Sequence, residues 1–367
     1  MPGAVDADYN YLYGLIRSRE GELIDAARLR ALVGMAGIDE IVQICPDSPF
    51  LDAFAPDLDE AALERAIASE QADLRWLIDR YAPQPALRDL LLVPRDLFNL
   101  KVALRLHAGS EGSATASAEQ ESADADADQD ALYGPPGTRT VASIRTAVAG
   151  REAGDGGPGL TSAGDIDPAS RALAGCLERS LGAFYAAGRN GQVLELAIDR
   201  LAHLYRIAIT DTVDPEVGAV YRDTAAIAAG ELLARGNAAG LAWEVARWGL
   251  LDLPSQADLG ALYETPAGDW GPRLAAFSGS LRALLARIGE GMETGAAVRV
   301  EQEAVAKRIA AWRYAPPSFA FAVYYLCKKQ ADLAALRMIC LAKLKGVAED
   351  TISARVGGAF MGQALAV

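Results

Sequence analysis

Residues 332–346 read Asp-Leu-Ala-Ala-Leu-Arg-Met-Ile-Cys-Leu-Ala-Lys-Leu-Lys-Gly, and this stretch is the clearest indication of the fold class. Its large apolar residues recur mostly at intervals of three and four, which is typical of an amphipathic helix and not of a half-buried strand. The same spacing occurs in two more segments, at Leu63, Ile67, Leu74, Leu77, Ile78 and Tyr81, and at Leu194, Ile198, Leu201, Leu204 and Tyr205. Alanine, the best helix former, fills much of the remainder. The sequence therefore predicts an all-α fold.

The quoted stretch also belongs to a weak internal repeat, which aligns with residues 96–109 and 223–236. In each copy an Asp precedes the apolar positions and a Gly follows them. Because Asp can accept the free N–H groups of a first turn and Gly can adopt the left-handed conformation that ends a helix, we expect each Asp to open a helix and each Gly to close it. Asp59 or Asp57 is expected to open the helix that contains Leu63.

The spacing of the copies indicates how the chain is organised. Their starts lie more than 100 residues apart, too far for a solenoid of roughly 20–50-residue units. We therefore expect three tandem helical modules, formed by residues 1–110, 132–237 and 238–367.

An acidic insert, residues 111–131, separates the first two expected modules. From Gly109 to Ala131 the chain has no aromatic or large apolar residue and no base, but seven carboxylates, half of the formal net charge of −14. Such a segment cannot bury enough apolar area to offset the entropy of ordering it. We predict that it is disordered, and that the Gly- and Pro-rich residues 150–170 form a linker.

The composition excludes several classes of protein. The chain has 367 residues, of which 51% are hydrophobic and 23% charged, the balance of a soluble globular protein. Its 35 basic and 49 acidic residues argue against a general nucleic-acid binder, which needs a surplus of bases. The longest apolar run, residues 319–327, is far below the roughly 20 residues of a membrane helix. The first residues also lack the features of a signal peptide, so we expect an unsecreted protein without a membrane span.

Few residues offer special chemistry. The four cysteines lie far apart and are expected to be reduced and buried. The two histidines, His107 and His203, lack metal-ligand spacing, and packed or rim positions are favoured for both. The alternating Asp residues from Asp124 to Asp130 lack the Gly and Glu of a calcium loop, and the Gly-rich loop before Pro158 lacks the ending of a phosphate-binding loop. No catalytic residue, cofactor or metal site is therefore expected.

The basic residues concentrate near the end of the chain. Residues 299–346 carry nine bases and three acids. These bases form either a solvated helix face or a patch for an acidic partner or a lipid surface. They are Arg299, Lys307, Arg308, Arg313, Lys328, Lys329, Arg337, Lys343 and Lys345.

Three stretches resemble one family. Residues 11–24, Tyr-Leu-Tyr-Gly-Leu-Ile-Arg-Ser-Arg-Glu-Gly-Glu-Leu-Ile, are similar to the start of the C subunit of V-type and archaeal-type ATPases, called the d subunit in the eukaryotic enzyme. Residues 96–105 resemble an Asp-x-x-Asn-Leu-Lys/Arg helix of that family, and residues 331–346 resemble its C-terminal helix pair. The chain departs from the pattern at Ala226 and Ala335, where Asn is favoured, so a polar contact from this position would survive only at Asn99.

The resemblance implies a fold and a function. The three modules would be related by pseudo-threefold symmetry in a funnel that seats the central shaft, with its D- and F-type subunits, and stands on the membrane proteolipid ring. The chain would be a non-catalytic rotor part of a proton- or sodium-transporting ATPase, and a peripheral membrane protein on the cytoplasmic face.

The candidate structural and interface residues are polar groups within the three resembling stretches and their surroundings. Those near Asp96 either cap a helix and form a surface polar pair, or orient their helix against its neighbours or the shaft. Asn99 and Lys101 are expected to point sideways or outward. The candidates are Arg17, Asp96, Asn99, Lys101, Arg105, Lys328, Lys329, Asp332 and Arg337.

Two alternatives remain open at this point. A generic helical scaffold for other protein partners has the same composition and needs no ring. An all-α enzyme could use carboxylates such as Glu195 or Asp199, although a solvent-exposed helix face explains these acids more simply.

Overall fold

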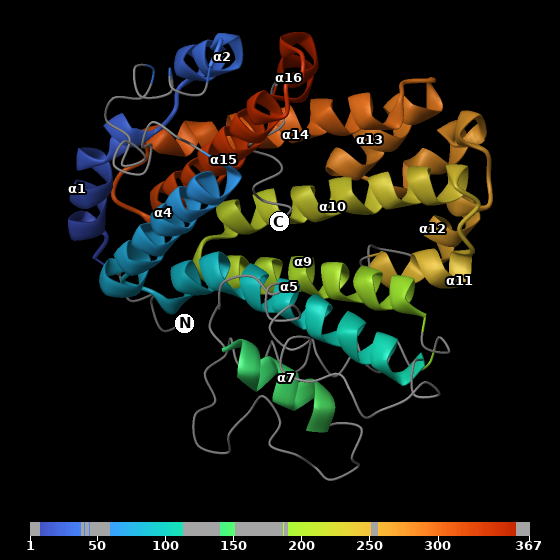
Figure 1. The fold of residues 1–367 in the computed structure, drawn as a ribbon. Helices are drawn as coiled ribbons and strands as arrows, with labels where there is room; N and C mark the ends of the chain where they lie inside the picture. The colour runs from blue at the N-terminus through green and yellow to red at the C-terminus, as the bar shows by residue number, and fades with distance from the viewer. Residues whose placement is uncertain are drawn as a thin grey trace. The chain divides into compact units, whose positions relative to one another are not determined.

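The computed structural model describes residues 8–37, 59–112, 140–150, 190–250 and 256–356, together with the single residues Glu40, Ile44 and Ala186. Every regular element within these ranges is a helix, which confirms the all-α prediction (Figure 1). The predicted acidic insert lies outside the described residues from position 113 onward, and so does the predicted linker beyond Gly150.

The chain forms two compact units, each assembled from separate stretches of sequence. Unit 1 contains residues 1–88, 210–224 and 295–367, and unit 2 contains residues 89–209 and 225–294. The first and the last of the described residues therefore belong to the same unit. The boundaries of the three expected modules stay a prediction.

Unit 1 is built mainly from α1 (Asn10–Ser18), η1 (Glu20–Glu22), α2 (Ala26–Gly34), α4 (Glu60–Tyr81), α14 (Thr294–Ala311), η7 (Trp312–Tyr314), α15 (Phe319–Leu344) and α16 (Glu349–Val356). Unit 2 contains α7 (Val141–Gly150), α11 (Trp243–Ala246), η4 (Arg247–Gly249), α12 (Gln256–Tyr263), η5 (Ala267–Asp269), η6 (Gly271–Ala276) and α13 (Gly279–Gly289). The division falls within the long helices α5 (Pro85–Gly112), α9 (Gly191–Val213) and α10 (Pro215–Ala238).

Helix α4 follows its sequence pattern closely. It begins after Asp59, whose side chain accepts the N–H of Ala62, as a helix cap does. The predicted apolar positions Leu63, Ile67, Leu74, Leu77 and Ile78 are all buried. Local capping and helical periodicity therefore suffice to place this helix.

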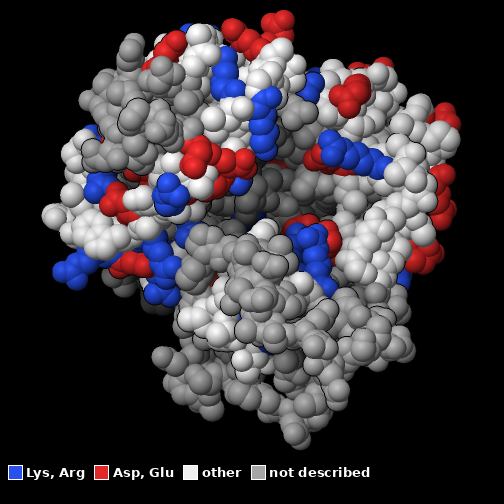
Figure 2. Space-filling view, viewed as in Figure 1, with Lys and Arg blue, Asp and Glu red and all other residues white. Residues whose placement is uncertain are grey.

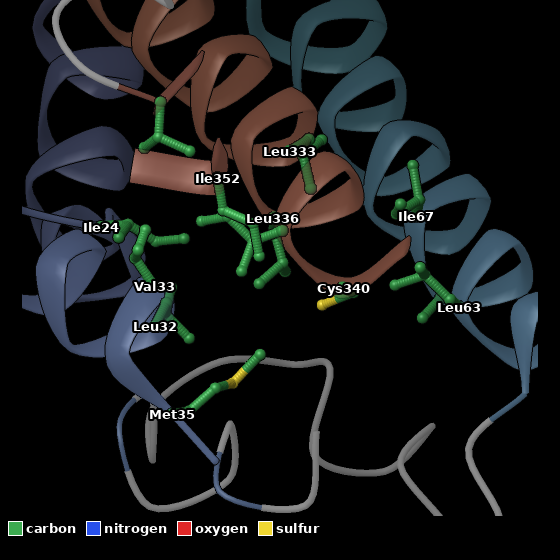
Figure 3. Packing of buried hydrophobic residues seen from close by; sticks show 13 residues of the cluster. Ile24, Leu32, Val33, Met35, Leu63, Ile67, Leu333, Leu336, Cys340 and Ile352 are labelled. Carbon is green, nitrogen blue, oxygen red and sulfur yellow. The ribbon is translucent and has the colours of Figure 1, made fainter. Parts of the chain in front are cut away.

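Helix α15 is the central element of unit 1. All residues of its apolar run 319–327 are buried in the protein interior. Farther along, Leu333, Leu336 and Cys340 pack between α2 and α4 (Figure 3). The longest apolar run of the chain is therefore part of a protein core.

The Asp residues of the repeat do not cap helices, which corrects the expectation from sequence. Asp96, Asp223 and Asp332 lie inside α5, α10 and α15. Helix α15 instead begins at Ser318, whose hydroxyl accepts the N–H of Phe321. A cap is worth only about 1 kcal/mol, less than the burial of an additional apolar turn, so α15 extends upstream of Asp332. Helix α5 likewise continues upstream of Asp96 and through Pro94.

The repeat glycines behave differently from one another. Gly346 has a φ of +66° and follows α15, as predicted, and the N–H of Val347 reaches back to the carbonyl of Ala342. Gly109 lies inside α5, and Gly236 lies inside α10, where the left-handed residue that follows the helix is Gly240. Gly236 has another role, because a Cβ atom there would lie 2.8 Å from the hydroxyl oxygen of Tyr263.

We predict that Gly236→Ala lowers the free energy of unfolding by about 1–2 kcal/mol, although Ala is the better helix former. The hydroxyl of Tyr263 donates to the carbonyl of Leu241 and cannot withdraw without losing that bond. The control is Gly14→Ala in α1, where a Cβ atom would meet nothing within 4 Å. It should stabilise the protein by about 0.5–1 kcal/mol. Denaturant unfolding measures both changes, and stabilisation by both would contradict the close approach at Gly236.

Candidate functional site

A pair of charged residues on α15 binds the backbone of the N-terminal segment. Ile24 lies between η1 and α2, and its N–H donates to Oδ2 of Asp332 over 2.9 Å. Nζ of Lys328 donates both to the carbonyl of Ile24 and to the carboxylate of Asp332, four residues away on the same helix. Burial raises the pKa of the Asp332 carboxyl, although Lys328 and the N–H of Ile24 oppose this shift. The pair thus satisfies both backbone groups of a residue outside any helix.

Lys329 is the most deeply buried cation of the basic region. Its Nζ lies 2.8 Å from Oε2 of Glu70 in α4 and 3.2 Å from Oε2 of Glu22 in η1. Burial alone lowers the pKa of Lys329, but Glu70 and Glu22 outweigh that effect and leave this pKa above its ordinary value. Burial also raises the pKa of nearby Tyr325 to about 12, so its phenol stays protonated. One ammonium therefore joins α15 to two other elements of unit 1.

Arg17 fixes α1 to the first turn of α15 and to the residues that precede it. Its guanidinium stacks 4.9 Å from the ring centroid of Tyr13 and 4.7 Å from that of Phe321. It also pairs with Glu20 at 2.7 Å and donates to the carbonyl of Arg313 at 2.7 Å. Stacking and planar hydrogen bonding together suit an arginine and not a lysine.

Most other cations of the basic region also bind groups within unit 1. Nε of Arg337 lies 2.6 Å from Glu64 in α4, and both side chains are largely exposed. Further pairs are Arg308 with Asp223, Lys343 with the carbonyl of Met35, Arg313 with Glu20, and Lys345 with Glu60. Figure 2 shows acidic and basic side chains interspersed over the face that it draws. The local surplus of bases found in the sequence is thus largely balanced by acids from other parts of the chain.

The second group of candidates lies on α5, in unit 2. Asp96 and Asn99 are fully buried, so the expectation that Asn99 points sideways or outward is wrong. The buried face of α5 is wider than the stripe of Leu97, Leu100 and Leu104, and it includes these two polar positions. Sequence periodicity identified the stripe but not its full width.

The two cations of this group pair with acids of α9. Nζ of Lys101 binds Asp199, and Nη2 of Arg105 lies 2.5 Å from Oε1 of Glu195. Glu195 and Asp199 are the acids that the enzyme alternative would use. Both have partners here that hold α9 against α5.

His203 on α9 is a buried titratable residue of unit 2. Burial lowers the pKa of His203 to about 4, and the positive charges of Arg206 and Lys101 add to the effect. Its Nδ1 has no hydrogen-bond partner among the residues that the structure describes. The packed position agrees with the prediction for His203, whereas the side chain of His107 lies outside the described residues. An imidazole in this setting stays neutral at pH 7.

Sequence reasoning missed Glu70, although a signal for it existed. Glu70 falls in phase with the apolar positions Leu63, Ile67, Leu74 and Leu77 of α4. An acid on the buried face of a helix requires a buried partner, and Lys329 is that partner. Lys329 and Asp332 are similarly in phase with buried Leu336 of α15.

Within the ranges that the structure describes, no group of three His, Cys, Asp or Glu side chains could hold a metal ion. No helix in the same ranges has both the length and the apolar character to cross a bilayer.

Comparison with known proteins finds a partial relative. The chain is 30% identical over 105 residues to the C subunit of the A-type ATP synthase of Methanocaldococcus jannaschii. The match covers 27% of this chain and 26% of that protein, so it spans about a quarter of each. No family model matches the chain. The partial similarity supports a relationship to the C subunits of A/V-type ATPases.

Proposed function

We propose that this chain is a non-catalytic central-stalk adaptor of a rotary A/V-type ATPase, which couples the rotating shaft to the membrane proteolipid ring. The observation that carries the proposal is the partial similarity to the C subunit of an A-type ATP synthase. The helical fold of the described residues agrees with this role.

The physical requirements of an adaptor support the same proposal. Transmission of torque needs a stiff body with complementary surfaces, and close-packed helices supply stiffness without reactive residues. In unit 1, α15 packs against α4 through an apolar cluster and through buried Lys329. In unit 2, α5 packs against α9 through an apolar cluster that includes Leu100 and Ile198. Such contacts resist the sliding of one helix past another.

We further propose partners and a location. The chain would bind shaft subunits of the D and F types and the proteolipid ring, on the cytoplasmic face of the membrane, in a complex that transports protons or sodium ions. Three modules around a pseudo-threefold axis would form the funnel that seats the shaft. No cofactor is required for this role.

Purification from native membranes tests the proposal. The full chain, tagged and expressed at its natural level, is extracted in mild detergent, and the bound proteins are identified and quantified. We expect shaft and ring subunits in fixed ratio to the tagged chain. Recovery with unrelated soluble proteins alone would favour a generic helical scaffold instead. Tight binding of ATP to the isolated chain would also overturn the proposal.

The same purification tests the interface candidates. Arg105 and Arg337 have side chains that are 58% and 54% exposed, whereas that of Lys329 is 7% exposed. Reversal to Glu at either arginine should weaken assembly more at low salt than at high salt, because exposed charges are screened. Assembly that does not depend on salt in both variants would remove them as candidates.

A further inference from the structure

Residues 9–35, which include α1, η1 and α2, form a segment that we name the N-terminal strap. Its Leu32 and Met35 cover one side of α15, while Leu63 and Ile67 of α4 lie on the other side (Figure 3). The strap is also held by charged groups of α15 and α4. Several of these charged groups differ from ordinary core contacts. When the strap is released, each of them keeps another partner within α4 and α15 or can bind water.

Lys329 shows this property most clearly. It binds Glu22 on the strap and Glu70 on α4, and the shorter of the two contacts, at 2.8 Å, is the one with Glu70. Departure of the strap would remove Glu22 and leave a complete Lys329–Glu70 pair. The penalty for stranding a buried charge, which normally opposes the breaking of a buried ion pair, is therefore absent.

Two other ties follow the same rule. Lys328 and Asp332 bind the backbone of Ile24, but they also bind each other within α15. Asp73 of α4, which pairs with Arg19 of the strap, has a side chain that is 48% exposed, so water can replace the arginine. These charges of α4 and α15 are thus satisfied with the strap closed and with the strap open, whereas Lys343 of α15 would lose the carbonyl of Met35.

We propose that the N-terminal strap is a releasable element, which opens as a unit while α4 and α15 stay folded and paired. Opening uncovers an apolar face of α15 that includes Leu333, Leu336 and Cys340. This inference rests on the contacts of unit 1 and does not depend on the proposed rotary role. The open form is a minor state, because closing buries Leu32, Val33 and Met35.

Thiol labelling tests the proposal, because Cys340 is fully buried and its sulfur points to the side where Leu32 and Met35 lie (Figure 3). The full chain is treated with a maleimide at neutral pH, and labelling of Cys340 is followed by peptide mass spectrometry. We call α4 and α15, which stay folded when the strap opens, the body of unit 1. Amide hydrogen exchange of residues 74–78 in α4 reports unfolding of this body. We expect the rate of Cys340 labelling to exceed the rate at which the body unfolds, as measured by the exchange of these amides.

Two matched variants each remove one of the two carboxylate partners of Lys329. Glu22→Gln removes the acid that leaves with the strap, and we expect labelling of Cys340 to accelerate roughly fivefold to tenfold with α4 exchange unchanged. Glu70→Gln removes the acid that stays, and we expect it to accelerate α4 exchange and labelling together. Equal acceleration of both readouts by both variants would show that the strap opens only when the body unfolds. No acceleration by Glu22→Gln would also overturn the proposal.

Discussion

Lys329→Met should lower the free energy of unfolding by about 3–5 kcal/mol, the largest effect that we expect from a single substitution in unit 1. The substitution keeps the apolar stem but leaves Glu70 buried without its cation. The side chains of Lys329 and Glu70 are only 7% and 6% exposed, so water cannot replace the lost partner. Denaturant unfolding at neutral pH measures the change.

A second substitution separates the lost charge from the lost packing. In the double variant Lys329→Met/Glu70→Met both buried charges are gone, and most of the stability should return, because a buried ion pair contributes little relative to apolar residues of similar size. If the double variant is as unstable as Lys329→Met alone, packing and not the stranded carboxylate sets the loss.

Arg337 provides a matched control on the same pair of helices. It joins α15 to Glu64 of α4, as Lys329 joins α15 to Glu70, but the two side chains are 54% and 40% exposed. Arg337→Met should therefore change the free energy of unfolding by less than about 1 kcal/mol. Similar losses at Arg337 and Lys329 would mean that burial does not distinguish the two pairs.

The second large effect is a dependence of stability on pH that originates at His203. Burial holds the folded-state pKa of His203 at about 4, below the ordinary value of 6.5. As the pH falls below 6.5, the unfolded chain binds a proton that the folded protein does not bind. The stability contributed by neutral His203 is therefore complete above pH 6.5 and is lost progressively toward pH 4, by about 3 kcal/mol in total.

His203→Leu removes this titration and keeps an apolar side chain in the site. We expect the difference in unfolding free energy between the natural protein and the variant to change by up to about 3 kcal/mol between pH 7 and pH 4. Chemical denaturation at a series of pH values measures it. His107→Leu, at the only other histidine of the sequence, is the comparison variant. Parallel pH curves for the natural protein and His203→Leu would show that His203 is not held neutral by burial.

The three copies of the repeat show which features of the helices can be predicted from local sequence patterns. Sequence predicted helices at residues 96–109, 223–236 and 332–346, and these segments are helical apart from residues 345 and 346, which follow α15. It also predicted the end of α15 at Gly346, because a left-handed residue after a helix is a local requirement. The predicted starts at Asp96, Asp223 and Asp332 are wrong, since each helix continues upstream with additional buried turns.

The candidate residues show which contacts cannot be predicted from local sequence patterns. A sum of charges over residues 299–346 indicated a basic patch, but it did not include Glu22, Glu64 and Glu70, which bind two of those cations, Lys329 and Arg337. The periodicity of α4 did contain a readable signal, an acid in phase with buried leucines. That signal, which the sequence analysis did not use, indicates that Glu70 needs a cation but not which one.

Short-range patterns were sufficient for the helical class, for a cap at Asp57 or Asp59 and for the glycine that ends α15. These features depend on residues within one or two turns of one another, so their energetics are visible in a short window. The burial of Asn99, the position of Lys329 between two carboxylates and the binding of Ile24 by α15 became visible only in the folded chain. The N–H of Ile24 and its acceptor Asp332 are 308 positions apart, and packing of whole helices, not local spacing, brings such groups together.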